Sequence, residues 1–238
     1  GIPKSPIIPV AAQSSLNIDA LIGAVEETIE TPTRDESKNT VLHVLRSFDI
    51  NKPGTKIKNL NGGVIGGSLI QGKFSIGDEI EIKPGLQNEK KKNYQSIHTE
   101  IVSLGTGAGI VDVVKPGGLV AIGTKLDPSL TRSDSLIGSV IGKPDTLPEN
   151  STGAKLQVHL FDTAVGSAGE TKVTPIKVDE LLRVSVGTAP VPAKVTKVTS
   201  DNIEIEFKRP VCIFAKGSVA LSRRIAERWR LIGAGVID

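Results

Sequence analysis

Three glycine-containing stretches come close to nucleotide-binding motifs, and the first is residues 67–73. It reads Gly-Ser-Leu-Ile-Gln-Gly-Lys and matches a phosphate-binding P-loop up to Phe74, which stands where a Ser or Thr hydroxyl would coordinate magnesium. A P-loop also connects a strand to the N-terminus of a helix, whereas this stretch lies inside a β pattern. We therefore interpret residues 67–73 as barrel turns.

The other two near-matches also lack a required residue. Asn51-Lys52 begins like the guanine-recognising motif Asn-Lys-x-Asp, but Gly54 occupies the Asp position. Residues 105–109 read Gly-Thr-Gly-Ala-Gly, like a dinucleotide-binding loop, yet Ile110 replaces the third required glycine and no helix is expected to follow. We interpret this stretch as a hairpin loop, and we expect that the chain does not hydrolyse a nucleotide on its own.

The remaining chemistry-bearing residues favour structural roles. The three histidines His43, His98 and His159 lie in strand-like segments and have no second ligand at metal spacing. The single cysteine, Cys212, sits in the apolar run 211–214, which is typical of a buried structural thiol. No Gly-x-Ser-x-Gly elbow occurs. The sequence therefore predicts no catalytic residue and no metal site.

Composition favours a mainly β protein with real cores. Hydrophobic residues make up 38% of the 238 residues, and 25 Gly and 14 Pro supply turns and discourage long helices. The net charge of +3 is too mild to require nucleic acid, and one Trp, one Tyr and five Phe are too few for a base-stacking surface. No apolar stretch approaches the length of a membrane span, so we expect a cytoplasmic protein with no membrane partner.

The first 35 residues predict one strand and one helix. Residues 6–12 have the pattern of a buried strand, and apolar residues recur at helical spacing from Ile18 to Ile29, with Asn17 as the expected N-cap and Thr31-Pro32 as the end. A single βα unit makes no domain. The chain also begins in mid-pattern and contains no Met, so we expect an upstream portion that completes the sheet.

From residue 40 the hydrophobic period changes from 3.6 to 2, which predicts short antiparallel strands. In the first module the expected strands are 41–45, 64–65, 68–70, 79–82, 99–103, 119–122 and 136–141, with a turn at Pro84-Gly85. In the second module they are 155–161, 181–186, 193–198 and 203–207. Apolar residues from Leu221 to Ile232 recur at helix-like intervals, so pattern alone leaves the tail open between a helix and a hairpin.

Five stretches carry a family resemblance. Residues 62–80, with paired glycines and Gly77-Asp78, resemble the second-domain barrel of translational GTPases. Within that superfamily, further stretches resemble the gamma subunit of archaeal and eukaryotic translation initiation factor two: 46–54, 115–124, 127–132 and 221–233. The resemblance implies two consecutive elongation-factor-Tu-like β-barrels, preceded by the terminal strand and helix of a G domain. The implied domains are 1–35, 40–147 and 152–238, and the tail is expected to be a hairpin.

The resemblance also implies site residues. Ala11, Ala12 and Gln13 match the guanine-side loop of a domain that binds GTP or GDP with magnesium in the full-length protein, although Ala11 replaces the usual Ser. The residues expected to contact tRNA are Thr131, Arg132, Asp134, Gly118, Lys125, Arg46, Lys52, Arg223 and Arg224.

The function implied is to help bind initiator methionyl-tRNA and the alpha subunit for GTP-dependent delivery to the small ribosomal subunit. The implied partners include the beta subunit, and the full-length family is a GTPase. Two alternatives stay open. The barrels could belong to another translational GTPase, an elongation or selenocysteine factor, or the chain could be a protein-interaction scaffold without tRNA binding.

Overall fold

A computed structural model describes residues 5–87, 94–166 and 171–238, and it divides the chain into two compact units, Gly1–Arg34 and Asp35–Asp238. The first unit contains the 3-10 helix η1 (Ala12–Ser14) and the helix α1 (Ile18–Thr28). The expected helix is confirmed. Asn17 occupies the N-cap position as expected, but its backbone is left-handed and its side-chain amide donates to the Pro9 carbonyl at 3.0 Å, so it makes no side-chain capping bond.

The strand expected over residues 6–12 does not form. Among the described residues of the first unit, β pairing is limited to an isolated bridge between Ala11 and Leu16. A strand needs a neighbour to satisfy its backbone groups, and Pro6 and Pro9 have no N–H to offer one. The expected buried strand is therefore wrong for this segment, in which Ile7 is 95% exposed.

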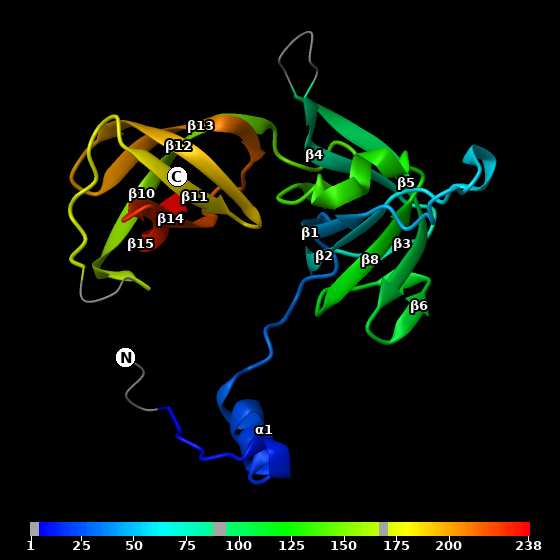
Figure 1. Cartoon of the computed structure of the whole chain (residues 1–238), viewed down its shortest axis with the longest axis horizontal. Helices are drawn as coiled ribbons and strands as arrows, with labels where there is room; N and C mark the ends of the chain where they lie inside the picture. Colours follow the sequence, from blue (N-terminus) through cyan, green and yellow to red (C-terminus); the bar gives the residue numbers. More distant parts are fainter. Residues whose placement is uncertain (1–4, 88–93, 167–170) are drawn as a thin grey trace. The chain divides into compact units, whose positions relative to one another are not determined.

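The second unit contains two β-barrels (Figure 1). The strands of the first are β1 (Val41–Phe48), β2 (Val64–Gln71), β4 (Glu79–Gln87), β5 (Tyr94–Thr106), β6 (Gly109–Val111), β8 (Leu119–Thr124) and β9 (Val140–Gly142), and β3 (Phe74–Ser75) pairs with β7 (Val113–Val114) in a separate two-stranded sheet. The sheet order is β4-β9-β1-β2-β8-β5-β6, and an additional β4–β5 pairing closes the barrel. Two 3-10 helices belong to this barrel, η2 (Ile57–Asn59) and η3 (Pro128–Asp134).

The second barrel closes in the order β10-β13-β12-β11-β14-β15, where β10 pairs with both β13 and β15. Its strands are β10 (Asn150–Val165), β11 (Leu181–Val186), β12 (Ala189–Val198), β13 (Asn202–Cys212), β14 (Ser218–Ile225) and β15 (Arg228–Ile237). The mainly β fold with two consecutive barrels is therefore confirmed. In the described ranges no helix is long and apolar enough to cross a membrane.

Period-2 alternation builds both cores. In β2 every second residue from Ile65 to Leu69 is buried, and in β11 Leu182 and Val184 are buried while their neighbours are not. Large side chains that the first barrel excludes completely from solvent include Leu42, Phe74, Ile80, Ile82, Ile101, Ile122 and Ile141. Burial of each such side chain contributes roughly 1.5–3 kcal/mol, so these alternate positions decide which face of each strand points inward.

Two predictions about strand ends are wrong. β4 continues through Pro84-Gly85, where we expected a turn, because its pairing with β5 shifts register between Ile82 and Leu86. The strand expected over 136–141 is reduced to β9, since the preceding residues belong to η3 and the turns that follow it. The tail is a hairpin, as the family resemblance implied, with Ala226 and Glu227 both at positive φ in its tight turn.

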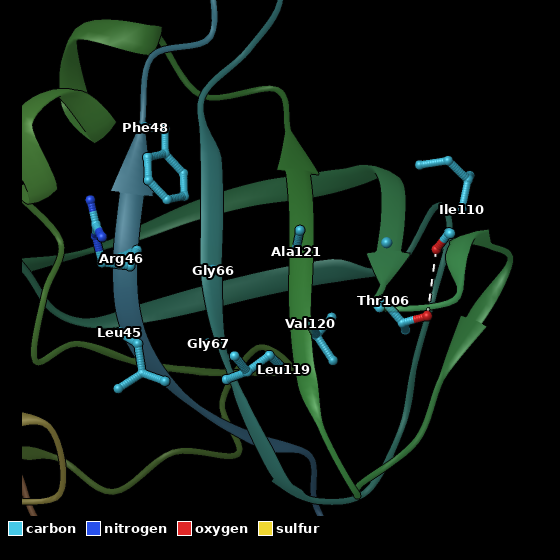
Figure 2. A pocket seen from close by; sticks show the side chains of 13 residues that line it. Leu45, Arg46, Phe48, Gly66, Gly67, Thr106, Ile110, Leu119, Val120 and Ala121 are labelled. Atoms are coloured by element: carbon cyan, nitrogen blue, oxygen red, sulfur yellow. Dashed lines mark hydrogen bonds between the residues drawn. The ribbon is translucent and has the colours of Figure 1, made fainter. Parts of the chain in front are cut away.

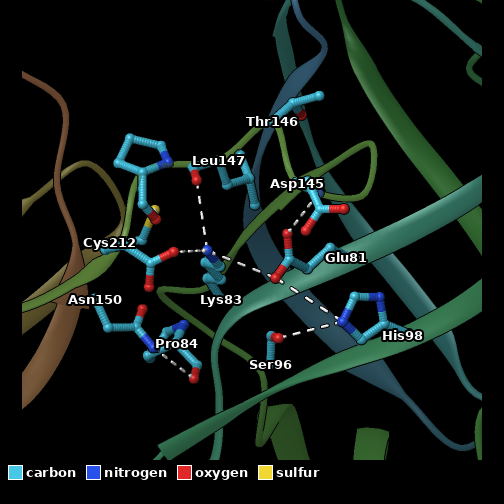
Figure 3. Close-up of polar contacts among 12 residues, drawn as sticks. Glu81, Lys83, Pro84, Ser96, His98, Asp145, Thr146, Leu147, Asn150 and Cys212 are labelled. Carbon is cyan, nitrogen blue, oxygen red and sulfur yellow. Dashed lines mark hydrogen bonds and ion pairs between the residues drawn. The ribbon is translucent and has the colours of Figure 1, made fainter.

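The two barrels meet along a polar and apolar seam (Figure 3). The Lys83 ammonium lies 3.6 Å from the Glu81 carboxylate and 3.4 Å from that of Glu149, and the Lys83 and Glu81 side chains are 8% and 5% exposed. The Asn150 amide donates to the Pro84 carbonyl at 3.0 Å. Because an unpaired charge would be costly to bury, the pairing of Lys83 ties β4 to the segment that leads into the second barrel.

His43 lies in the same seam and faces apolar surroundings. Its ring makes an edge contact with Phe214 at 6.4 Å between centroids. A Cβ at Gly187 would lie 2.7 Å from the His43 ring, so the β11–β12 turn needs glycine there, all the more because its φ is +54°. Burial lowers the pKa of His43 below its usual value.

We predict that His43 makes folding stability depend on pH. Below about pH 6.5 the unfolded imidazole takes up a proton that the folded one resists, so the free energy of unfolding falls by up to about 1.4 kcal/mol per pH unit until the folded pKa is reached. Denaturant unfolding between pH 7.5 and 5.5 measures this slope. His43→Gln, which cannot be protonated, should show a shallower slope; equal slopes for the two proteins would contradict the prediction.

Candidate functional site

Four of the residues expected to contact tRNA lie around one hollow of about 570 Å³ on the first barrel. Arg46 comes from β1, Lys52 from the loop after β1, and Arg132 and Asp134 from η3. We call this hollow the polar hollow. Its lining residues are Arg46, Ser47, Phe48, Asp49, Asn51, Lys52, Pro53, Gly54, Thr55, Leu60, Arg132, Ser133 and Asp134.

A β-bulge in β1 aims side chains at this hollow. The register with β2 shifts between Val44 and Arg46, so that Leu45 has no partner of its own. Because the extra residue reverses the alternation, Leu45, Arg46 and Phe48 are exposed whereas Ser47 is buried. The inward Ser47 hydroxyl accepts a hydrogen bond from the backbone N–H of Leu136, which fastens the chain after η3 to β1.

The Asp134 carboxylate fixes η3 against β1. It accepts hydrogen bonds from the Arg46 Nε at 2.9 and 3.1 Å and from the backbone N–H of Ser47 at 2.9 Å. These bonds, that from Ser47 first, hold the pKa of Asp134 below its usual value. The carboxylate is therefore engaged inside the protein.

Thr131 is fully buried. Its hydroxyl oxygen lies 2.8 Å from the Phe48 carbonyl oxygen and 3.0 Å from that of Pro128, and it donates to them. A ligand therefore cannot reach the Thr131 side chain, whose position supports the exposed neighbour Arg132.

The loop between β1 and β2 forms a basic rim. Asn51 closes the loop, because its side-chain amide donates to the Asn61 carbonyl and its side-chain oxygen accepts from the Asn61 N–H, both at 2.8 Å. Lys52, Lys56 and Lys58 are exposed on the loop, and none of them pairs through its ammonium with another residue of the described ranges. The loop thus carries three cations without an ion pair in the described ranges, and Lys52 among them lines the polar hollow.

A second hollow, of about 540 Å³, adjoins the first and is almost entirely apolar (Figure 2). We call it the apolar pocket. It is lined by Leu45, Arg46, Phe48, Gly66, Gly67, Gly105, Thr106, Gly107, Gly109, Ile110, Leu119, Val120 and Ala121. Leu119 and Ile110 are 68% and 80% exposed, so they present apolar surface to solvent at the pocket.

Glycines form the floor of the apolar pocket for two different reasons. A Cβ at Gly67 would lie 2.4 Å from the His43 carbonyl oxygen, so packing requires glycine there. A Cβ at Gly66 would meet only ordinary contacts, at 3.7 Å from Arg46 and Phe48. Packing therefore does not require glycine at position 66, and the missing side chain leaves space in the pocket.

Arg46 and Phe48 form the wall that the two hollows share. The Arg46 guanidinium lies over the Phe48 ring, 5.2 Å from its centroid, a cation–π geometry. Arg46 uses its Nε on Asp134, and its two terminal nitrogens have no hydrogen-bond partner in the described part of the chain. The arrangement can bind an anion at the boundary of a surface that accepts an apolar or planar group.

Two other predicted residues flank β8, outside both hollows. Gly118 lies in the exposed turn before β8, with open space around it. Lys125 follows β8, and its ammonium is 2.6 Å from the Glu100 carboxylate. An RNA contact by Lys125 would have to compete with that ion pair.

The predicted arginines of the second barrel are also engaged. Arg223 donates to both carboxylate oxygens of Glu180, at 2.5 and 3.1 Å, and to the Thr174 carbonyl at 2.9 Å. Arg224 pairs with Glu227 across the β14–β15 turn. The Arg223 side chain is 16% exposed, so its geometry is that of a structural ion pair.

Ala11, Ala12 and Gln13 lie at η1 in the first unit. The Ala11 carbonyl accepts from the N–H groups of Ser14 and Leu16, whereas the Ala12 N–H has no partner among the described residues. The Ala12 amide is therefore free to donate a hydrogen bond to a ligand.

Sequence reasoning missed the apolar pocket. Leu119 points outward in phase with the alternation of β8, and Leu45 points outward at the bulge of β1. A large apolar residue at each of these outward positions was the available signal. In the described residues no group of three or more His, Cys, Asp or Glu side chains could hold a metal ion.

Comparisons with known proteins agree with the geometry. The family model "Initiation factor eIF2 gamma, C terminal" matches residues 152–237. Translation initiation factor 2 subunit gamma is 51% identical to this chain over 236 residues in Aeropyrum pernix and in Pyrococcus furiosus, and 49% over 234 residues in Archaeoglobus fulgidus. Each match covers 98% of this chain but only 55–57% of the relative, so the chain spans little more than half the length of these relatives.

A solved structure shares the fold. The crystal structure of the bacterial selenocysteine-specific elongation factor EF-Sec matches 97% of this chain and 33% of its own, with a TM-score of 0.73 and 14% identity. That likeness concerns the fold alone, whereas half of the residues are shared with the initiation factor subunits over nearly the whole chain. The chain belongs to the translation initiation factor 2 gamma-subunit family, and residues 152–237 are that family's C-terminal domain.

Proposed function

We propose that this chain helps bind initiator methionyl-tRNA and docks the alpha subunit, for GTP-dependent delivery to the small ribosomal subunit in the cytoplasm. GTP or GDP with magnesium would bind to the G domain of the full-length protein, for which Ala11 to Gln13 would supply the guanine-side loop. The beta subunit completes the proposed assembly. In this reading the first barrel holds the aminoacylated acceptor end.

One observation carries the tRNA part of the proposal: the apolar pocket and the polar hollow share the Arg46–Phe48 wall. An acceptor end presents planar bases and an amino acid side chain beside phosphates, so it needs an apolar surface next to cations. Arg132, Lys52 and the free nitrogens of Arg46 are the cations placed there. Thr131 and Asp134 would support this surface from within.

A protein-interaction scaffold is the second candidate. The exposure of Leu119 and Ile110 favours it, because apolar surface of this kind also suits a protein partner. The ion pairs of Arg223, Arg224 and Lys125 favour it as well, since they leave fewer cations for RNA.

We predict salt-dependent binding of initiator methionyl-tRNA by the chain joined to a family G domain and loaded with GTP. Phosphate contacts release counterions, so the affinity should fall steeply between about 50 and 200 mM salt. Filter binding at the two salt concentrations measures this, with elongator methionyl-tRNA as the specificity control. No binding in either salt would favour the scaffold, and equal affinity for the elongator would favour an elongation-type factor.

We predict that Arg132→Ala weakens tRNA binding by about three- to tenfold and lowers the slope of log affinity against log salt by about 1, because one phosphate contact is lost. The exposed Arg132 side chain has no hydrogen-bond or ion-pair partner in the described ranges, so the barrel should stay folded. Lys208→Ala removes an equal charge from the second barrel and serves as the control. An unchanged affinity would remove Arg132 from the site.

We predict that Leu119→Ser weakens tRNA binding by about tenfold without changing the salt slope, because it removes apolar contact area and no charge. Leu119 is already largely exposed, so the thermal midpoint should hold. Leu181→Ser, at the 44% exposed Leu181 of the second barrel, is the matched control. If both serine variants bind like wild type, the apolar pocket has no part in holding tRNA.

A further inference from the structure

We propose that Asp134 is a positioning residue, which does not touch tRNA but holds the turn that presents Arg132 to it. This inference rests on the proposed function and names a device within the same site. It also changes the expectation for Asp134, which the family resemblance placed among the residues in contact with tRNA.

The turn at the end of η3 has a backbone that needs support. Arg132 is extended, with φ −66° and ψ 142°, and the next two residues, Ser133 and Asp134, have φ of 54° and 60°. Left-handed backbone is disfavoured for residues with a side chain, and two in succession are rarer still. Such a turn persists only where its surroundings hold it.

The Asp134 carboxylate supplies that support. Its three hydrogen bonds come from the side chain of Arg46 and the backbone of Ser47, two neighbouring residues of a strand that belongs to the closed barrel. The side chain is 30% exposed, and both of its oxygens face β1 partners. The carboxylate thus joins a strained turn to a rigid element.

Hydrogen bonds on either side of Arg132 also hold the turn against β1. Thr131 is bonded to the Phe48 carbonyl, and Leu136 is bonded to the Ser47 hydroxyl. Arg132 itself is exposed and lines the polar hollow, and no other described residue bonds to its side chain. Its guanidinium makes no hydrogen bond or ion pair with the described residues, and the Asp49 carboxylate acts on it only through a weaker electrostatic attraction, so the conformation of the turn is the main determinant of its position.

Charge alone predicts the opposite effect of removing Asp134. A carboxylate near RNA phosphates repels them, so its loss should strengthen binding if Asp134 were merely a surface charge. A positioning role predicts weaker binding, because Arg132 would lose its fixed placement. The sign of the effect therefore separates the two roles.

The test compares Asp134→Asn and Asp134→Ala in the tRNA-binding form of the protein. Both variants remove the same charge, but Asn keeps an acceptor oxygen for the Ser47 amide and tolerates left-handed backbone, whereas Ala does neither. We expect the affinity for initiator methionyl-tRNA to fall in the order wild type, Asp134→Asn, Asp134→Ala, with the alanine variant about tenfold weaker, the equivalent of one charge-assisted hydrogen bond. The salt slope of Asp134→Ala should fall towards that of Arg132→Ala, because the displaced Arg132 loses its phosphate contact.

Asp112→Ala is the charge control, because Asp112 is exposed on the same barrel and its carboxylate has no partner in the described ranges. It should bind tRNA as tightly as wild type or more tightly. Thermal unfolding of Asp134→Asn checks that its barrel is intact.

Other outcomes of the binding measurements would contradict the positioning role or the proposed function. Equal or stronger binding by both Asp134 variants would overturn the positioning role, and so would equal weakening by Asn and Ala or a salt slope of Asp134→Ala that stays at the wild-type value. If Arg132→Ala weakens binding while the Asp134 variants do not, this inference fails and the proposed function stands. If wild type shows no tRNA binding, the proposed function fails and this inference fails with it.

Discussion

Closure of two small antiparallel barrels is the constraint on which the rest of the structure depends. A closed barrel has no free edge, and alternate residues of each strand must fill its interior. In the first barrel the β4–β5 pair completes the ring, and Ile80, Ile82 and Ile101 on these strands are fully buried. Once the interior is filled, every apolar side chain in the opposite phase has to face outward.

The candidate site follows from that rule and from one departure from it. Leu119 faces outward because Val120 takes the inner position in β8. The bulge at Leu45 then changes the phase of β1, so that one strand presents Leu45, Arg46 and Phe48 on the outside and Ser47 on the inside. The same bulge thus places Leu45 at the apolar pocket and Arg46 at the boundary between the two hollows. It also turns Ser47 inward, where its hydroxyl holds the chain after η3 through the Leu136 N–H. A regular β1 could not do all three.

Much of the fold could be predicted because period 2 is a local property of the sequence. The structure confirms strands over 79–82, 119–122 and 181–186, and the first of these alternates cleanly in the sequence. Strand ends could not be predicted in this way, because β4 runs through Pro84-Gly85 by a register shift that only its partner β5 reveals. The tail misleads for a related reason: its two-residue turn changes the phase between β14 and β15, and apolar residues on the two strands then imitate a helical spacing.

The candidate site could be predicted in part, and only through the family resemblance. It named Arg46, Lys52, Arg132 and Asp134, which the structure brings to one hollow. Whether each of these side chains is buried, paired or exposed depends on residues far away in the sequence, so no local pattern could show it. Arg223 forms an ion pair with Glu180, which lies 43 positions away in the sequence. The buried Thr131 hydroxyl donates to the carbonyl of Phe48, which lies 83 positions away.

The pairing of charges separates the predicted arginines of the second barrel from the cations that line the polar hollow. An arginine that already holds a carboxylate, as Arg223 does, gains little from a phosphate because one partner must be given up for the other. Arg132 and Lys52 have no such partner in the described ranges. The second barrel is instead joined through Lys83 on β4, the strand that also closes the first barrel. A change that loosens β4 would therefore disturb the barrel that carries the site and the seam to the second barrel together.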